Sequence, residues 1–237
     1  MILRRLPDSR FSEVVREWEG GTCVILGGGP SLTFKQIEAV NKAHMLGEVR
    51  CIAVNDSYLW APWADVCYFA DGQFWQWHTD GIDKPILGLK AEQVRNRFAA
   101  FAGEKCSISV VGNRIEDIKI TDDAVHILKN KRTNYQELSL DPHHLATAQG
   151  KNGGFQALNL AVLAGAKDII LLGIDGKPGH FHGGHPKPTP DHFYEAMRKA
   201  FSCAETAIKE AGVRVLNCSP GTAVDSFPKM ALEEALA

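Results

Sequence analysis

The sequence predicts an α/β fold of the Rossmann-like type, in which helices cover both faces of a mostly parallel sheet. Three observations predict it. Short apolar runs alternate along the chain with stretches whose apolar residues recur at helical spacing. Most runs are continuously apolar, which is typical of strands buried on both faces of a parallel sheet. No linker or repeat divides the 237 residues, so we expect 1–237 to form a single domain with its own core.

The first half of the chain contains five of the expected strands. The first one ends in a run of glycines, and the helical periodicity that follows begins at Thr33. The expected strands are 22–26, 51–54, 66–70, 86–87 and 107–111, of which 86–87 has the weakest pattern. The expected helices are 33–44 and 91–101.

The periodicity weakens in residues 112–150, where charged and polar residues dominate. A segment of this length without a pattern is more often an active-site insertion or lid than a plain connector. We therefore expect 112–150 to be an insertion or lid within the domain.

Clear patterns return after residue 152. Gly165 is placed to end a short apolar helix in the left-handed conformation, Asp191 to cap a long helix, and Thr222 to cap a short last one. The expected elements are a helix at 155–163, a strand at 169–174, a helix at 191–211, a strand at 213–216 and a short helix after residue 222.

Composition and charge exclude several classes of protein. Lys and Arg total 26 against 28 Asp and Glu, so there is no basic excess and we expect no nucleic-acid partner. No apolar run reaches the roughly 18 residues of a membrane span, and the first residues lack the apolar centre of a signal peptide. None of the 6 cysteines forms C-x-x-C, which favours reduced core thiols in a cytoplasmic protein.

Polar residues and glycines follow five of the expected strands, at the point where each strand ends. Because open parallel sheets bind ligands at the carboxyl ends of their strands, these residues predict one binding pocket. The alternative is that they are only common turn residues. The residues are 27–31, Asn55 with Asp56, Asp71, Asp175 and 217–219.

The sharpest of these features is the run Gly27, Gly28, Gly29, Pro30 and Ser31. Glycines let the backbone approach a ligand closely, and the free N–H groups of the following helix suit a phosphate. The hydroxyl of Ser31 is a further candidate donor. The run matches neither the dinucleotide fingerprint G-x-G-x-x-G nor the P-loop, so we expect a nucleotide phosphate bound in another way.

A second glycine-rich helix entry consists of Lys151, Asn152, Gly153 and Gly154. Two such entries in one sheet suit a pyrophosphate, or a phosphate together with a sugar. The alternative is a plain turn in which Asn152 caps the helix.

Three histidines, His180, His182 and His185, lie in a loop rich in glycine and proline that follows Asp175. Three hypotheses stay open. One histidine acts as a general acid or base, since its pKa lies near working pH. The histidines and Asp175 bind a metal, although the spacing matches no standard zinc signature. The loop is a polar lid in which the histidines have no chemical role.

Three segments resemble the bacterial sialyltransferases that use CMP-sialic acid. They are V-I-L-G-G-G-P-S-L at 24–32, the stretch from K-N-G-G-F-Q to L-L-G-I-D at 151–175, and R-V-L-N-C-S-P-G at 214–221. The same signatures occur in flagellin-modifying nonulosonate transferases, in archaeal 6-hydroxymethylpterin diphosphokinases and in bacteriophage relatives. The resemblance implies the fold predicted above.

The resemblance also implies roles in nucleotide binding. Residues 27–31 would hold the nucleotide phosphate or ribose, and Asn55 matches the family's asparagine after the second strand. Residues 151–153 match a Thr-Ser-Gly motif near the donor sugar. Ser219 and Gly221 match the turn that holds the cytosine.

For catalysis, the resemblance implies a histidine base after the Gly-Ile-Asp strand, where this chain has His180, His182 and His185. The chain departs from the family in two places. Gly28 replaces an asparagine, and residues 176–190 contain none of the tyrosines that assist the leaving phosphate. Lys177 or a histidine would have to supply that assistance.

The function implied is a nucleotide-sugar-dependent glycosyltransferase with a CMP-activated donor and a glycan or small-molecule acceptor. Such an enzyme requires no cofactor, and a homo-oligomer stays open. The first alternative is a diphosphokinase with Mg²⁺ on Asp71 or Asp175, since phosphoryl transfer needs charge neutralisation. The second is a non-catalytic nucleotide-binding or phage accessory protein.

Overall fold

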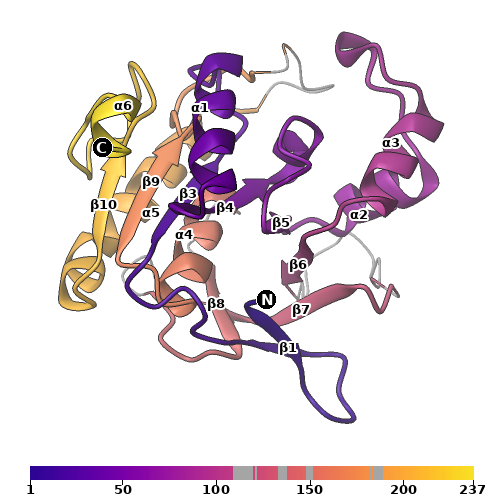
Figure 1. Ribbon diagram of the computed structural model, residues 1–237, viewed down its shortest axis with the longest axis horizontal. Coiled ribbons are helices and arrows are strands. Elements are labelled where there is room, and N and C mark those ends of the chain that lie inside the picture. The colour runs from indigo at the N-terminus through magenta and orange to yellow at the C-terminus, as the bar shows by residue number, and fades with distance from the viewer. Residues whose placement is uncertain (109–119, 121, 133–137, 148–151, 182, 184–188) are drawn as a thin grey trace.

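A parallel sheet organises the chain, as Figure 1 shows. The computed structural model describes residues 1–108, 120, 122–132, 138–147, 152–181, 183 and 189–237. Within these residues, 8 strands form one sheet in the order β10-β9-β3-β4-β5-β6-β7-β8, and every neighbouring pair is parallel. The strands are β3 (Thr22–Leu26), β4 (Val49–Val54), β5 (Val66–Tyr68), β6 (Glu104–Ile108), β7 (Val125–Arg132), β8 (His144–Thr147), β9 (Asp168–Leu172) and β10 (Arg214–Asn217). A separate antiparallel pair consists of β1 (Leu3–Arg5) and β2 (Ser12–Val14).

Helices cover both faces of the sheet, which confirms the predicted fold class. Side chains of β3 alternate between two cores: Cys23 and Ile25 point into one, and Val24 and Leu26 into the other. The first core packs against α4 (Gly153–Leu163) and α5 (Asp191–Glu210). The second packs against α1 (Phe34–Met45), α2 (Gly72–Asp80), α3 (Ala91–Ala99) and α6 (Leu232–Ala235).

The strand order places a topological switch point in the middle of the sheet. From β3 the chain builds outward through β4 to β8, then returns through α4 to β9 on the other side of β3. Connections from β3 and β9 therefore leave toward opposite faces, as α1 and α5 do. Open α/β sheets bind ligands at such a point, outside the carboxyl ends of the strands.

Two strand predictions near the middle of the chain need correction. The expected strand at 86–87 is wrong, because Pro85–Leu87 is a 3-10 helix (η2) that begins at a proline, whose fixed φ suits a helical start. The strand expected at 107–111 is displaced, since β6 begins at Glu104. Glu104 is buried, and its carboxylate accepts hydrogen bonds from the N–H groups of Ile2 and Leu3, at 2.7 and 2.9 Å. These bonds offset the cost of burying the charge. An apolar pattern cannot find such a strand.

Residues 112–150 contain two strands that the sequence pattern did not predict. β7 and β8 extend the sheet at one edge, and β7 includes three basic residues in its second half. Much of the rest of the predicted insertion or lid lies outside the described residues, and for that part it stays a prediction.

The predicted helix caps are right in one case of three. Gly165 has φ +98° and follows Ala164, the C-cap residue of α4, as expected. Asp191 lies in the first turn of α5, and Pro190 is its N-cap residue. Thr222 caps no helix, because its hydroxyl donates to the Ile174 carbonyl at 2.9 Å and α6 begins ten residues further on.

Burial of the cysteines predicts their reactivity. Cys203 is partly exposed, and the other five are buried: Cys23, Cys51, Cys67, Cys106 and Cys218. Burial raises the pKa of those five thiols, that of Cys218 to about 11, so few of them are thiolates near neutral pH. We expect a thiol reagent to label Cys203 first in the native protein, as mass spectrometry of the labelled peptides would show. Early labelling of a buried strand cysteine would contradict the core packing.

Candidate functional site

The run Gly27–Ser31, called the glycine loop below, packs directly on the backbone that follows β9. Gly27 and Gly29 donate N–H bonds to the carbonyls of Leu172 and Gly173, at 2.7 and 2.8 Å. A Cβ on Gly27 would lie 2.5 Å from the Gly173 oxygen, and one on Gly29 would lie 2.6 Å from it. A Cβ on Gly28 would meet no described atom within 4 Å apart from its chain neighbours. Two glycines are therefore required by packing, and the third faces open space.

Asp175 lies against the glycine loop and is only 3% exposed. Its Oδ2 accepts hydrogen bonds from the Ser31 hydroxyl at 2.8 Å and from the Ser31 N–H at 3.2 Å. Its Oδ1 is buried and has no hydrogen-bond partner among the described residues. A buried carboxylate oxygen without a donor is costly, so this atom is a candidate acceptor for a ligand hydroxyl or a cation. The Ser31 hydroxyl, expected to face a ligand, donates to Asp175 instead.

The second glycine-rich entry forms the start of α4. Asn152 is the N-cap, and its Oδ1 accepts from the Phe155 N–H at 3.2 Å. Its Nδ2 is buried without a partner among the described residues. A Cβ on Gly154 would lie 2.7 Å from the Ile174 side chain, so the helix start packs beside the end of β9. This start provides free N–H groups and the positive end of the helix dipole. Lys151 lies outside the described residues.

The turn after β4 joins these two entries. It is a 3-10 helix, η1 (Asn55–Leu59), whose Ser57 hydroxyl donates to the Gly27 carbonyl at 2.9 Å. Asn55 has φ +52°, a left-handed conformation that asparagine tolerates better than most residues. Its Nδ2 lies 3.8 Å from where a Cβ of Gly153 would stand. The ends of β3, β4 and β9 and the start of α4 therefore lie together, and we call this the ligand edge.

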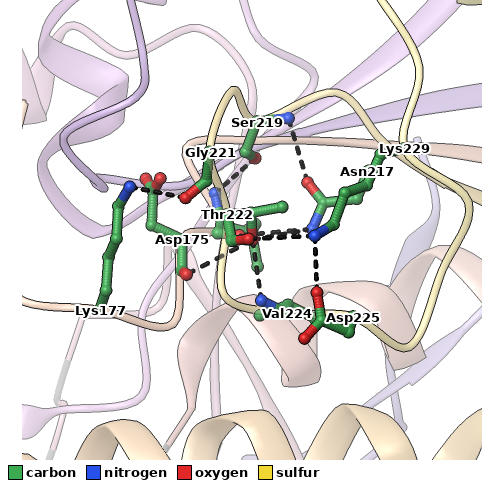
Figure 2. Close-up of polar contacts among 10 residues, drawn as sticks. Asp175, Lys177, Asn217, Ser219, Gly221, Thr222, Val224, Asp225 and Lys229 are labelled. Atoms are coloured by element: carbon green, nitrogen blue, oxygen red, sulfur yellow. Dashed lines mark hydrogen bonds and ion pairs between the residues drawn. The ribbon is translucent and has the colours of Figure 1, made fainter.

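The turn after β10 is fastened to the ligand edge by polar groups that the fold itself uses (Figure 2). Ser219 is buried, and its hydroxyl accepts from the Ile174 N–H at 3.0 Å. Gly221 has φ +65°, and its carbonyl accepts from the Lys177 ammonium at 2.6 Å. Lys177 is half-buried, and this bond holds its ammonium near the carboxyl end of β9.

Asp71 has a structural explanation. It is exposed and caps α2, where its Oδ1 accepts from the Gln73 N–H at 2.9 Å. This is the turn-residue alternative, and among the described residues no hydrogen bond or ion pair joins Asp71 to the ligand edge. Among the described residues, no group of three or more His, Cys, Asp or Glu side chains could hold a metal ion.

The histidine loop crosses the glycine loop. The Phe181 N–H donates to the Gly28 carbonyl at 2.9 Å, and a Cβ on Gly179 would lie 3.1 Å from the Pro30 ring. His180 is half-buried between these two contacts. His182 and His185 lie outside the described residues.

Asp56 is a charged residue whose partners the sequence did not reveal. It follows Asn55 in η1, and its two carboxylate oxygens bind His78 Nε2 at 3.0 Å and Lys84 Nζ at 2.7 Å. These partners are 22 and 28 residues away, so no local pattern could link them. His78 is fully buried in α2, a helix that the sequence pattern did not predict.

The pKa of Asp56 predicts how stability responds to acid. Burial alone would raise the pKa of this carboxyl, but the hydrogen bond from His78 and the charge of Lys84 hold it below its usual range. Ionised Asp56 therefore stabilises the fold above the unfolded-state pKa of about 4, and this stabilisation is lost as the pH falls through the lower folded-state pKa. We expect urea titrations to show that wild type exceeds Asp56→Asn in free energy of unfolding near neutral pH, with the gap narrowing steadily below about pH 4. A gap that is the same at all pH values would contradict the ion pairing.

Two grooves among the described residues lie away from the ligand edge. They are near the C-terminal ends of α4 and α5, one of about 270 Å³ and one of about 410 Å³. Both include Leu140 and Ala211, and neither contains a residue of the ligand edge. Their charged side chains are Arg16 and Lys167 in one groove and Lys131, Asp141 and Glu210 in the other. The switch point of the sheet and the Asp175 Oδ1, which has no partner among the described residues, select the ligand edge as the candidate site.

Comparison with solved structures tests the fold. The Maf glycosyltransferase from Magnetospirillum magneticum superposes with a TM-score of 0.57 at 14% identity, covering 95% of this chain and 36% of that one. The sialyltransferase CstII from Campylobacter jejuni, in complex with CMP-3FNeuAc, gives 0.52 at 12% identity, covering 89% and 86%. The same enzyme with a trisaccharide acceptor and CMP gives 0.51 at 12% identity.

This chain has a sialyltransferase-like fold. The fold that the sequence motifs implied is thereby confirmed. No protein-family model matches the chain, and no curated protein is significantly similar to it in sequence. The chain spans about a third of the Maf protein, and identities of 12–14% establish shared architecture alone. Among the described residues, no helix is long and apolar enough to cross a membrane.

Proposed function

We propose that this chain is a glycosyltransferase of the sialyltransferase-like type that binds a CMP-activated sugar at the ligand edge. The observation that carries the proposal is the buried, unpartnered Oδ1 of Asp175 beside the glycine loop. It lies at the switch point of a sheet whose solved relatives include a sialyltransferase in complex with a CMP-sugar analogue.

The ligand edge offers complementary groups to the two ends of a nucleotide. The start of α4 presents free N–H groups, and the Asn152 Nδ2 is a buried donor without a partner among the described residues. These groups suit a phosphate. Asp175 Oδ1 is an acceptor and suits a ribose hydroxyl. The absence of a side chain at Gly28 leaves open the space that such a ligand would occupy.

The proposed reaction uses a loop histidine as general base. An acceptor hydroxyl oxygen bonds to the anomeric carbon of the donor, the bond from that carbon to the phosphate oxygen breaks, and the histidine takes the hydroxyl proton. His180, His182 and His185 are the candidates. Lys177 already has its ammonium at this edge and would stabilise the departing phosphate, together with the start of α4. No cofactor is required for these steps.

The same Asp175 oxygen supports one other function. A carboxylate without a donor can hold Mg²⁺, as a diphosphokinase would need. Asp71, the other carboxylate considered for this role, is used as a helix cap.

Calorimetry with CMP, CDP, UDP, ATP and GTP, each with and without Mg²⁺, tests the proposal. We expect cytidine nucleotides to bind without metal, and Asp175→Asn to weaken that binding roughly 10- to 100-fold. In this variant the one remaining oxygen keeps its two Ser31 donors, so an NH₂ group replaces the Oδ1 acceptor. The matched control is Asp168→Asn at the opposite end of β9, where the carboxylate pairs with Arg214. Purine binding that needs Mg²⁺ would favour the diphosphokinase. If no nucleotide binds, both the glycosyltransferase and the diphosphokinase are overturned.

A further inference from the structure

His78 is a fully buried histidine with an acceptor at each ring nitrogen. Nδ1 lies 2.7 Å from the Phe74 carbonyl oxygen, four residues earlier in α2. Nε2 lies 3.0 Å from Asp56 Oδ1. A carbonyl oxygen only accepts hydrogen bonds, and so does an ionised carboxylate. Each nitrogen must therefore donate, which requires the doubly protonated ring, an imidazolium.

The surroundings of the ring suit a cation. Its face stacks on the Phe74 ring at 3.8 Å between centroids, and the rings of Tyr58 and Phe98 lie at 5.6 Å. Aromatic faces attract cations, and the full negative charge comes from Asp56. A buried charge is tolerated when it is paired and hydrogen-bonded on every side, as this one is.

Asp56 binds a second cation with its other oxygen. Lys84, in the turn after α2, places its ammonium 2.7 Å from Asp56 Oδ2. The two cations come from different segments, and the carboxylate that joins them belongs to η1. Asp56 is thereby fixed through both oxygens.

The turn that Asp56 fixes belongs to the ligand edge. Its neighbour Asn55 is held at φ +52° beside the start of α4. Ser57, the residue after Asp56, donates to the Gly27 carbonyl of the glycine loop at 2.9 Å. A shift of Asp56 would move both contacts together, because η1 is a single short turn.

We infer that His78 is a positioning residue: as a buried imidazolium it holds Asp56, and through η1 it sets Asn55 and the glycine loop in the geometry that binds the nucleotide. The functional part rests on the proposed function. The protonation of His78, and its effect on the conformation of η1, can be tested without any ligand. The proposed reaction assigns no contact with a reacting atom to His78, Asp56 or Lys84, so we expect their effect to be on binding geometry.

The first measurement is nitrogen-15 NMR of the full chain labelled at histidine, with the His78 signals assigned by their loss in His78→Gln. We expect both ring nitrogens of His78 to carry protons near neutral pH. One unprotonated ring nitrogen would overturn the inference. The side-chain amide signals of Asn55 should shift in His78→Gln and in Lys84→Met, and stay in place in Lys84→Arg, which keeps the charge.

The matched control is His44→Gln. His44 is another histidine paired with an aspartate, Asp65, at 3.0 Å, but it lies in the last turn of α1, away from the glycine loop. We expect His78→Gln and Lys84→Met to weaken CMP binding about tenfold or more, and His44→Gln to leave it unchanged. If His78→Gln does not fold, the CMP affinity of Lys84→Met tests the positioning role. Unchanged CMP affinity in a folded variant would overturn the positioning role. Failure of wild type to bind CMP would overturn the proposed function alone, because the NMR results would still stand.

Discussion

Replacing Gly28 with valine is expected to abolish nucleotide binding and to leave the fold nearly as stable as wild type. A side chain there meets no described atom within 4 Å, so the protein has room for it. That same room is where the phosphate or ribose would pass, and a branched side chain would block it. We expect calorimetry to show a loss of at least about 100-fold in affinity, and Gly28→Ala to give an intermediate loss.

Gly29 provides the contrast. A Cβ on Gly29 would overlap the Asp175 carboxylate, so Gly29→Ala should lower the free energy of unfolding as well as the affinity. Urea titrations of both variants separate the two effects. Nucleotide affinity that is unchanged in Gly28→Val would exclude the glycine loop from the site.

Replacing Asn159 with leucine is expected to cost about 3–5 kcal/mol of stability. Asn159 is fully buried in α4. Its Oδ1 accepts from the N–H groups of Ser139 and Ala146 at 3.0 and 2.9 Å, and its Nδ2 donates to the Ser139 carbonyl at 2.9 Å. Leucine would leave three backbone groups without partners in the interior, where water cannot replace the bonds.

Gln156→Leu is the comparison variant, since Gln156 is a buried amide in the same helix. It accepts one hydrogen bond, from the Tyr68 hydroxyl at 2.9 Å, and within the described part of the chain no backbone group bonds to its side chain. Urea unfolding should therefore show a clearly smaller loss for Gln156→Leu. Equal losses in the two variants would mean that Asn159 does not fasten β8 and its preceding turn to α4.

The sequence predicted the centre of the sheet well and its edge poorly. β3, β4 and β9 are buried on both faces, so their residues are continuously apolar and the pattern finds them. β7 ends in Lys129, Asn130, Lys131 and Arg132, and an apolar pattern cannot detect such a strand. What defines β7 is its pairing with β6 and β8, which is information about distant segments.

At the candidate site, the sequence predicted which strand ends carry polar residues but not what each group does. Gly27, Gly28 and Gly29 look alike in sequence, yet only Gly28 faces open space. Ser219 was expected in a ligand-binding turn, and its hydroxyl instead accepts from the Ile174 N–H. Such assignments depend on which acceptor or donor each group meets, and only the folded arrangement supplies that.

The pairing of His78 with Asp56 is a second feature that the sequence pattern could not predict. An isolated histidine on an apolar helix face usually indicates packing, and His78 does pack, against Phe74. Its second ring nitrogen meets the Asp56 carboxylate, which follows the end of β4. This contact gives His78 a charge and a role that no local spacing predicts.

A crystal structure of the chain with CMP bound tests the central claim most directly. We expect CMP at the ligand edge, with its phosphate at the start of α4 and the glycine loop and a ribose hydroxyl on Asp175 Oδ1. CMP bound in a groove lined by Leu140 and Ala211 would contradict this placement, as would CMP at the ligand edge with no ligand group on Asp175.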